Sequence, residues 1–147
     1  MPIQPGESAP AVPGLDPRGT TALVFYKVTC PTCQLAAPAM EHLHRAGPSR
    51  FAAVVQDPPE RAVSFASEFG TTFEPVSDAE PYELSDAFGI RTVPTVFLLN
   101  EGRVDDVVES WDRDGWNRLA KRLEQLTGDE VGVVSSEGDG LPPFKPG

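Results

Sequence analysis

The two cysteines of the chain, Cys30 and Cys33, are separated by only two residues. The apolar run Ala22–Tyr26 before them is typical of a buried strand, and apolar residues recur after them at helical spacing. A sulfur at the start of a helix lies near free N–H groups and the positive end of the helix dipole, which lowers its pKa. Pro31 suits the first helical turn, and Cys33 lies one turn further on. The pair therefore predicts a dithiol–disulfide redox centre.

The composition indicates a globular domain and limits its partners. The chain has 147 residues, of which 39 % are hydrophobic, enough for one domain with a substantial core. With 22 acidic and 12 basic side chains the net charge is −10, which disfavours nucleic acid and anionic membranes as partners. No apolar run approaches the length of a membrane span, and residues 1–7 lack the features of a signal peptide. We therefore expect a cytoplasmic monomer.

Turn residues and periodicity divide the chain into three parts. Residues 1–19 form an irregular lead-in, residues 20–127 a folded domain, and residues 128–147 a Gly/Pro-rich acidic tail in which Leu141 and Phe144 have the character of docking residues. Within the domain we predict strands at 20–28, 50–56, 71–76, 93–99 and 103–109. We predict helices at 31–45, from an N-cap at Asp57 to Gly70, at 82–88, and from an N-cap at Asp112 to Gly128.

This order of elements predicts an α/β fold with a central mixed β-sheet flanked by helices on both faces. Reactive loops of such sheets lie beyond the carboxyl ends of the parallel strands, which is where Cys30 falls.

A second segment, Phe88–Leu99, follows the cysteines at a distance of about sixty residues and contains Val93-Pro94-Thr95. Together with Cys30-Pro31-Thr32-Cys33 it resembles the thioredoxin superfamily, which implies the thioredoxin fold. In that family a cis-proline faces the disulfide and its backbone binds the substrate. The resemblance implies substrate-binding roles for the residues at and around these positions: Val93, Pro94, Thr95, Pro31 and Thr32.

The extra helix and strand between the cysteine helix and Pro94 resemble the peroxiredoxin-related, TlpA-like or redoxin branch of the family. That branch includes the reductases of cytochrome c maturation. Gly6–Pro10 resembles its usual opening, and Pro38 matches a kink in its cysteine helix. The resemblance covers roughly residues 6–127.

Several positions depart from the family pattern. Thr29 replaces the usual tryptophan, and Val24 and Ala36 stand where relatives have a carboxylate that deprotonates the second cysteine. A water or Lys27 must then take that proton. Ser110-Trp111 stands where a glycine is usual, and we expect Trp111 in the core rather than in the substrate groove. Neither cysteine lies in Pro-x-x-x-Thr-x-x-Cys, so peroxidase activity is disfavoured.

The residues support one main hypothesis and one alternative. The first is a thiol–disulfide oxidoreductase, a protein disulfide reductase serving cell redox homeostasis, in which Cys30 attacks a substrate disulfide and Cys33 resolves the adduct. It implies disulfide-containing proteins or small thiols as substrates, an unidentified dithiol electron donor, and no cofactor. The alternative is a binding protein that uses the cysteine pair for metal binding or redox sensing. Metal binding needs two more ligands, and we expect His42 and His44 at the surface, on different faces of their helix.

Overall fold

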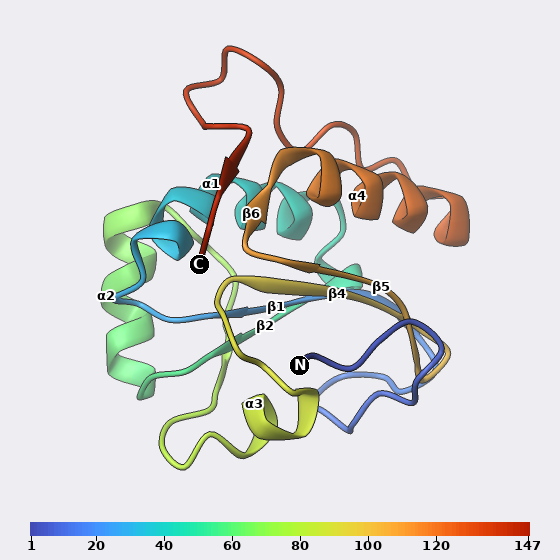
Figure 1. The fold of residues 1–147 in the computed structure, drawn as a ribbon, viewed down its shortest axis with the longest axis horizontal. Helices are drawn as coiled ribbons and strands as arrows, with labels where there is room; N and C mark the ends of the chain where they lie inside the picture. The colour runs from blue at the N-terminus through green and yellow to red at the C-terminus, as the bar shows by residue number, and fades with distance from the viewer.

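The computed structural model describes residues 1–147, and its centre is a five-stranded sheet in the order β3-β2-β1-β4-β5 (Figure 1). These strands are β1 (Thr20–Tyr26), β2 (Phe51–Val55), β3 (Val76–Ser77), β4 (Thr95–Asn100) and β5 (Arg103–Glu109). β1 pairs in parallel with β2 and antiparallel with β4, so the sheet is mixed. The predicted fold class is confirmed.

Four α-helices and a short 3₁₀ helix accompany the sheet. They are α1 (Pro31–Ala46), η1 (Pro48–Arg50), α2 (Pro59–Phe69), α3 (Glu83–Phe88) and α4 (Arg113–Thr127). In Figure 1, α1 and α4 cover one face of the sheet, and α3 lies on the other face together with the N-terminal lead-in. A second, two-stranded sheet pairs β6 (Trp111–Asp112) with β7 (Phe144–Lys145) near the start of α1. The sequence did not predict this small sheet.

β1 separates two hydrophobic cores because its side chains alternate between the faces of the sheet. Ala22, Val24 and Tyr26 belong to the larger core, which α1, α2 and α4 complete. Leu23 and Phe25 belong to the smaller core, to which the lead-in and α3 contribute. All seven residues of β1 are buried, so Cys30 follows a strand that is held rigidly on both sides.

Truncation of a core side chain should lower the stability of the protein. Leu98 of β4 is fully buried in the larger core, so Leu98→Ala should lower the free energy of unfolding by about 2–5 kcal/mol. Val63 on α2 is 70 % exposed, and Val63→Ala, which also truncates an aliphatic side chain, should change it by less than about 0.5 kcal/mol. Urea unfolding of the reduced proteins measures both values. Equal losses for the two variants would contradict this description of the core.

Two predicted local features are wrong. The third strand was expected at 71–76, but β3 contains only Val76 and Ser77. The backbone N–H of Thr72 donates to the carboxylate of Glu41 on α1 instead of to a strand, and this pulls the segment out of the sheet. Asp57 is not the N-cap of α2, because Pro58 has that position. The carboxylate of Asp57 instead accepts a hydrogen bond from the N–H of Val28, at 2.9 Å.

The tail is more ordered than its composition suggested. The carboxylate of Glu124 accepts hydrogen bonds from the N–H groups of Val131 and Gly132, and the side-chain oxygen of Asn117 accepts from Val134 and Ser135. These bonds lay residues 131–135 along α4, and Figure 1 shows the chain then returning toward the start of α1. Leu141 packs on the larger core, whereas the side chain of Phe144 is 56 % exposed and its backbone pairs in β7.

Candidate active site

Cys30 is the N-cap of α1, as its position after β1 predicted. Its sulfur accepts a hydrogen bond from the backbone N–H of Cys33 at 3.2 Å. The thiol also lies 3.4 Å from the carbonyl oxygen of Val93, to which it donates when protonated. Cys30 is partly exposed and Cys33 is fully buried, and both are free thiols. Only Cys30 is therefore accessible to an external disulfide.

The two thiols are strongly differentiated in acidity. Hydrogen bonding from Cys33 is the main reason that the pKa of Cys30 falls from 9.0 to about 6, with further help from the backbone of Thr32 and the charge of Lys145. Burial raises the pKa of Cys33 far above its ordinary value, and the nearby Cys30 and Asp57 raise it further. Cys30 is thus the thiolate near neutral pH, and Cys33 holds its proton.

This difference predicts the pH dependence of alkylation. In the reduced protein, modification of Cys30 by iodoacetamide should reach half its maximal rate near pH 6, because only the thiolate reacts. Below that pH the rate should fall about tenfold per unit as the thiolate is protonated. Lys145→Gln removes a positive charge that favours the thiolate, so its midpoint should move upward. Mass spectrometry of the alkylated peptide gives the profile, and a midpoint near 9 would contradict the assignment.

The segment around Pro94 lies opposite Cys30, as the resemblance implied. The Val93–Pro94 peptide bond is cis, and the carbonyl of Val93 lies 3.4 Å from the Cys30 sulfur. The carbonyl of Pro94 accepts a hydrogen bond from the N–H of Ser110 at 2.8 Å. Thr95 is fully buried and its hydroxyl donates to the carbonyl of Thr92, so its side chain is turned away from the groove.

The two residues between the cysteines have different environments. Pro31 is exposed beside Cys30, where an approaching substrate can contact it. Thr32 is only 2 % exposed, and its hydroxyl donates to the carbonyl of Pro146 at 2.6 Å. A residue predicted to contact substrate is therefore covered by the tail.

Asp57, which the sequence predicts to be a helix N-cap, instead has a buried carboxylate whose charge acts on Cys33. Asp57 follows the carboxyl end of β2, next to the end of β1, and its side chain is buried. Its charge raises the pKa of Cys33, and together with burial, the main cause, it also raises the pKa of Tyr26 above its ordinary value. The sequence held a signal for this position of Asp57, because Asp57 closely follows the strand next to the one that leads to Cys30, at the reactive edge of the sheet.

Other predicted side chains have structural positions. The Lys27 ammonium lies 5.3 Å from the centroid of the Tyr82 ring, a cation–π contact. Trp111 is fully buried in the larger core, as expected. The histidines are not simply surface residues, because His42 bonds to the carbonyl of Val131 and His44 packs against aromatic rings. No group of three or more His, Cys, Asp or Glu side chains lies together in a way that can hold a metal ion.

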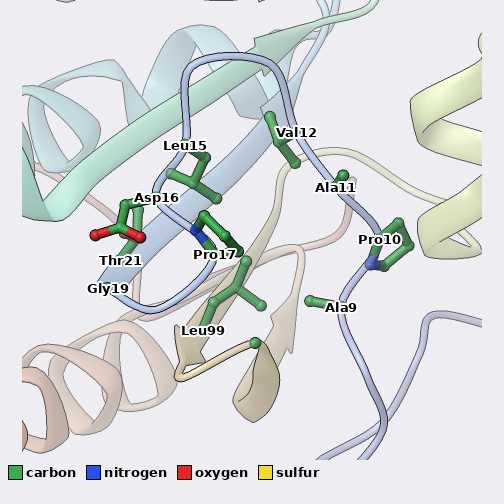
Figure 2. A pocket seen from close by; sticks show the side chains of 11 residues that line it. Ala9, Pro10, Ala11, Val12, Leu15, Asp16, Pro17, Gly19, Thr21 and Leu99 are labelled. Atoms are coloured by element: carbon green, nitrogen blue, oxygen red, sulfur yellow. The ribbon is translucent and has the colours of Figure 1, made fainter.

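A separate pocket of about 170 Å³ lies between the lead-in and β4 (Figure 2). Val12, Leu15 and Leu99 are among the side chains around it, and its lining includes neither cysteine nor any residue predicted to bind substrate. Asp16, its one charged residue, accepts a hydrogen bond from the backbone N–H of Arg18. The pocket contributes nothing to the cysteine chemistry.

Solved structures with the same arrangement identify the fold. A solution structure of a putative protein disulfide isomerase from Bacteroides thetaiotaomicron superposes with a TM-score of 0.68 at 18 % identity, over 86 % of this chain and 90 % of that one. The chain has the thioredoxin fold. The thioredoxin domain of a thiol-disulfide oxidoreductase from Bacteroides vulgatus gives a TM-score of 0.67 at 18 % identity, over 82 % and 99 % of the two chains. A secreted Mycobacterium tuberculosis disulfide oxidoreductase gives 0.57 at 18 % identity, over 76 % and 84 %.

A curated protein is also similar to this chain in sequence. The thiol-disulfide oxidoreductase ResA of Halalkalibacterium halodurans is 32 % identical over 83 residues, which are 54 % of this chain and 47 % of that protein. The matched part of the chain thus spans about half the length of this curated relative. No protein-family model matches the chain. The predicted thioredoxin fold is confirmed, and the similarity to a thiol-disulfide oxidoreductase over about half of the chain agrees with the resemblance noted in the sequence.

Proposed function

We propose that the protein is a thiol–disulfide oxidoreductase that reduces disulfides in other proteins. The observation that carries this proposal is the asymmetry of the cysteine pair. Cys30 is accessible with a pKa of about 6, whereas Cys33 is buried directly behind it with a strongly raised pKa. Two-step exchange requires an accessible thiolate that attacks the substrate disulfide and a second thiol that stays protonated until the mixed disulfide has formed.

In the first step the Cys30 thiolate attacks one sulfur of a substrate disulfide. The substrate S–S bond breaks, a mixed disulfide to Cys30 forms, and the other substrate sulfur leaves as a thiolate that takes up a proton. In the second step Cys33 loses its proton and attacks the Cys30 sulfur. The substrate's second thiol is released and a Cys30–Cys33 disulfide forms, so two electrons have passed to the substrate. An external dithiol then reduces the pair again.

The second step needs a group that accepts the Cys33 proton, and the buried carboxylate of Asp57 is our candidate for this role. Its carboxylate is buried and its charge acts on Cys33. One of its oxygens is occupied by the N–H of Val28, which holds the side chain in position. In this proposal Asp57 takes over, from another element, the role of the carboxylates that relatives have where this chain has Val24 and Ala36.

The basic test is disulfide reduction with a simple donor. The wild-type protein should accelerate the reduction of a small disulfide-bonded protein by dithiothreitol, and Cys30→Ser should abolish the acceleration. Val63→Ala, an exposed change on α2, is a suitable control and should leave the acceleration unchanged. A Cys30→Ser protein as active as the wild type would remove the basis of the proposal.

The reduction potential predicts the direction of electron flow. Potentials of related proteins run from about −270 mV for thioredoxin to about −120 mV for a strong oxidant. The hydroxyl of Thr32 donates to Pro146 rather than to the Cys30 sulfur, so the side chain before Cys33 gives no hydrogen bond to the thiolate. We expect a value in the reducing half of that range, suited to a reductase in a reducing compartment such as the cytoplasm. Equilibration with glutathione buffers measures it, and a value near the oxidising end would reverse the proposed direction.

A further inference from the structure

The end of the tail lies directly over the active site. The carbonyl of Pro146 accepts the hydroxyl hydrogen bond of Thr32, between the two cysteines, and the N–H of Gly147 donates to the hydroxyl of Ser110 at 3.1 Å. Ser110 in turn donates its own N–H to the carbonyl of Pro94. Residues 144–147 thus connect the first turn of α1 to the segment that carries the cis-proline.

The fit at Gly147 is tight. A Cβ atom at this position would overlap the carbonyl oxygen of Val93 and the hydroxyl of Thr92, although the backbone of Gly147 is not in the left-handed region. The same Val93 carbonyl lies 3.4 Å from the Cys30 sulfur. Gly147 therefore lies against the Val93 carbonyl that Cys30 also contacts, at a position where only a residue without a side chain fits.

The tail reaches this position as an added strand. Lys145 pairs with Trp111 and Phe144 with Asp112 in an antiparallel arrangement, so β6 uses its edge to bind an extended chain. This is the geometry of strand addition, in which backbone hydrogen bonds supply the affinity and few side chains are needed.

The tail is held more firmly before β7 than after it. Upstream of β7 it is fixed by the indole of Trp111, which donates to Pro142, and by Arg113, which donates to the carbonyl of Leu141. Beyond that point Phe144, Pro146 and Gly147 are exposed, and they are held mainly by backbone bonds. Segments with few buried contacts open at low cost, so residues 144–147 can leave while residues 131–142 stay bound.

We propose that residues 144–147 are a tethered competitor in the substrate groove, and that an extended segment of a disulfide-containing protein replaces them as the strand paired with Trp111–Asp112. The inference rests on the proposed function, since it names how that substrate binds. The short tether keeps the competitor at a high effective concentration, so only a substrate that can form comparable strand contacts displaces it. Small disulfides reach the partly exposed Cys30 without entering the groove.

The test is Gly147→Val, which keeps the full chain and its charges but leaves no room for residue 147 beside Val93. The rates are compared at pH 8, where Cys30 is a thiolate. The second-order rate constant of the variant with an unfolded, disulfide-bonded protein should be about tenfold higher than that of wild type. This ratio corresponds to the loss of one or two hydrogen bonds of ordinary net strength that hold the tail. The rate with glutathione disulfide should change less than about twofold. Hydrogen exchange in residues 144–147 should accelerate in the variant.

The matched control is Gly19→Ala, where an added Cβ meets only ordinary contacts with Asp16, and it should leave both rates at wild-type values. Wild-type rates for Gly147→Val with the protein substrate, despite accelerated exchange in the tail, would overturn the proposal. So would an equal rise with both disulfides, because the tail would then act on Cys30 rather than on the groove. If wild type and both variants reduce neither disulfide, the proposed function itself fails.

Discussion

Cys33→Ser is expected to accumulate covalent adducts with disulfide-containing proteins, and Cys30→Ser is expected to accumulate almost none. Cys30 is partly exposed with a pKa of about 6, so roughly ten thiolates are present per thiol at pH 7. Serine at position 33 keeps the backbone N–H that donates to the Cys30 sulfur. The first attack therefore still occurs, but no second thiol is available to release the adduct.

The contrast between the two single variants should exceed tenfold in the amount of adduct. It is measured by incubating each purified protein with a mixture of oxidised proteins, blocking free thiols, and comparing non-reducing and reducing gels. The double variant Cys30→Ser/Cys33→Ser sets the background. Similar adduct levels for the two single variants would mean that Cys33 is as reachable as Cys30, contrary to its complete burial.

The sequence was most informative where a short local pattern determines the structure. A buried strand followed by Cys-x-x-Cys and a helical apolar pattern placed Cys30 at the N-cap of α1, because strand and helix periods differ and the change between them marks the junction. The N-cap at Asp112 was predicted from the same kind of local signal, and its carboxylate accepts from the N–H of Gly115.

Features that depend on distant contacts were not predictable in this way. Residues 71–75 have a strand-like composition, but the hydrogen bond from Thr72 to Glu41 removes them from the sheet. The tail has the composition of a solvated segment, yet α4 and β6 supply polar partners for its backbone. These partners lie outside residues 128–147, so the local sequence of the tail does not predict that Pro146 bonds to Thr32 and covers it.

Asp57, the proton acceptor that we propose, shows the same limit. Asp followed by two prolines and Glu60 is a good local signal for the start of a helix, and α2 does begin there. The side chain nevertheless turns to Val28 because the ends of β1 and β2 are adjacent. Val24 and Ala36 occupy the positions at which relatives have a proton acceptor, whereas the acceptor that we propose, Asp57, follows the end of a neighbouring strand.

Asp57→Asn should therefore slow the release of substrate from the mixed disulfide by about a hundredfold at pH 7, within the range expected for the loss of a general base. Asparagine keeps an oxygen for the N–H of Val28, so the local structure should persist. An opposing effect exists, because removing the negative charge lowers the pKa of Cys33. That effect is the smaller one, since burial is the main cause of the raised pKa and Asp57 contributes less than Cys30.

The two steps can be separated with a disulfide whose first leaving thiol is coloured. The rapid release of the coloured thiol reports attack by Cys30, and its rate should be unchanged in Asp57→Asn. The slower decay of the mixed disulfide reports attack by Cys33. In the variant that decay should rise about tenfold per pH unit, because hydroxide replaces the carboxylate as proton acceptor. Glu60→Gln neutralises an exposed carboxylate three residues away and should leave both phases unchanged. Decay in Asp57→Asn as fast as in wild type would show that Asp57 acts on Cys33 only as a nearby charge.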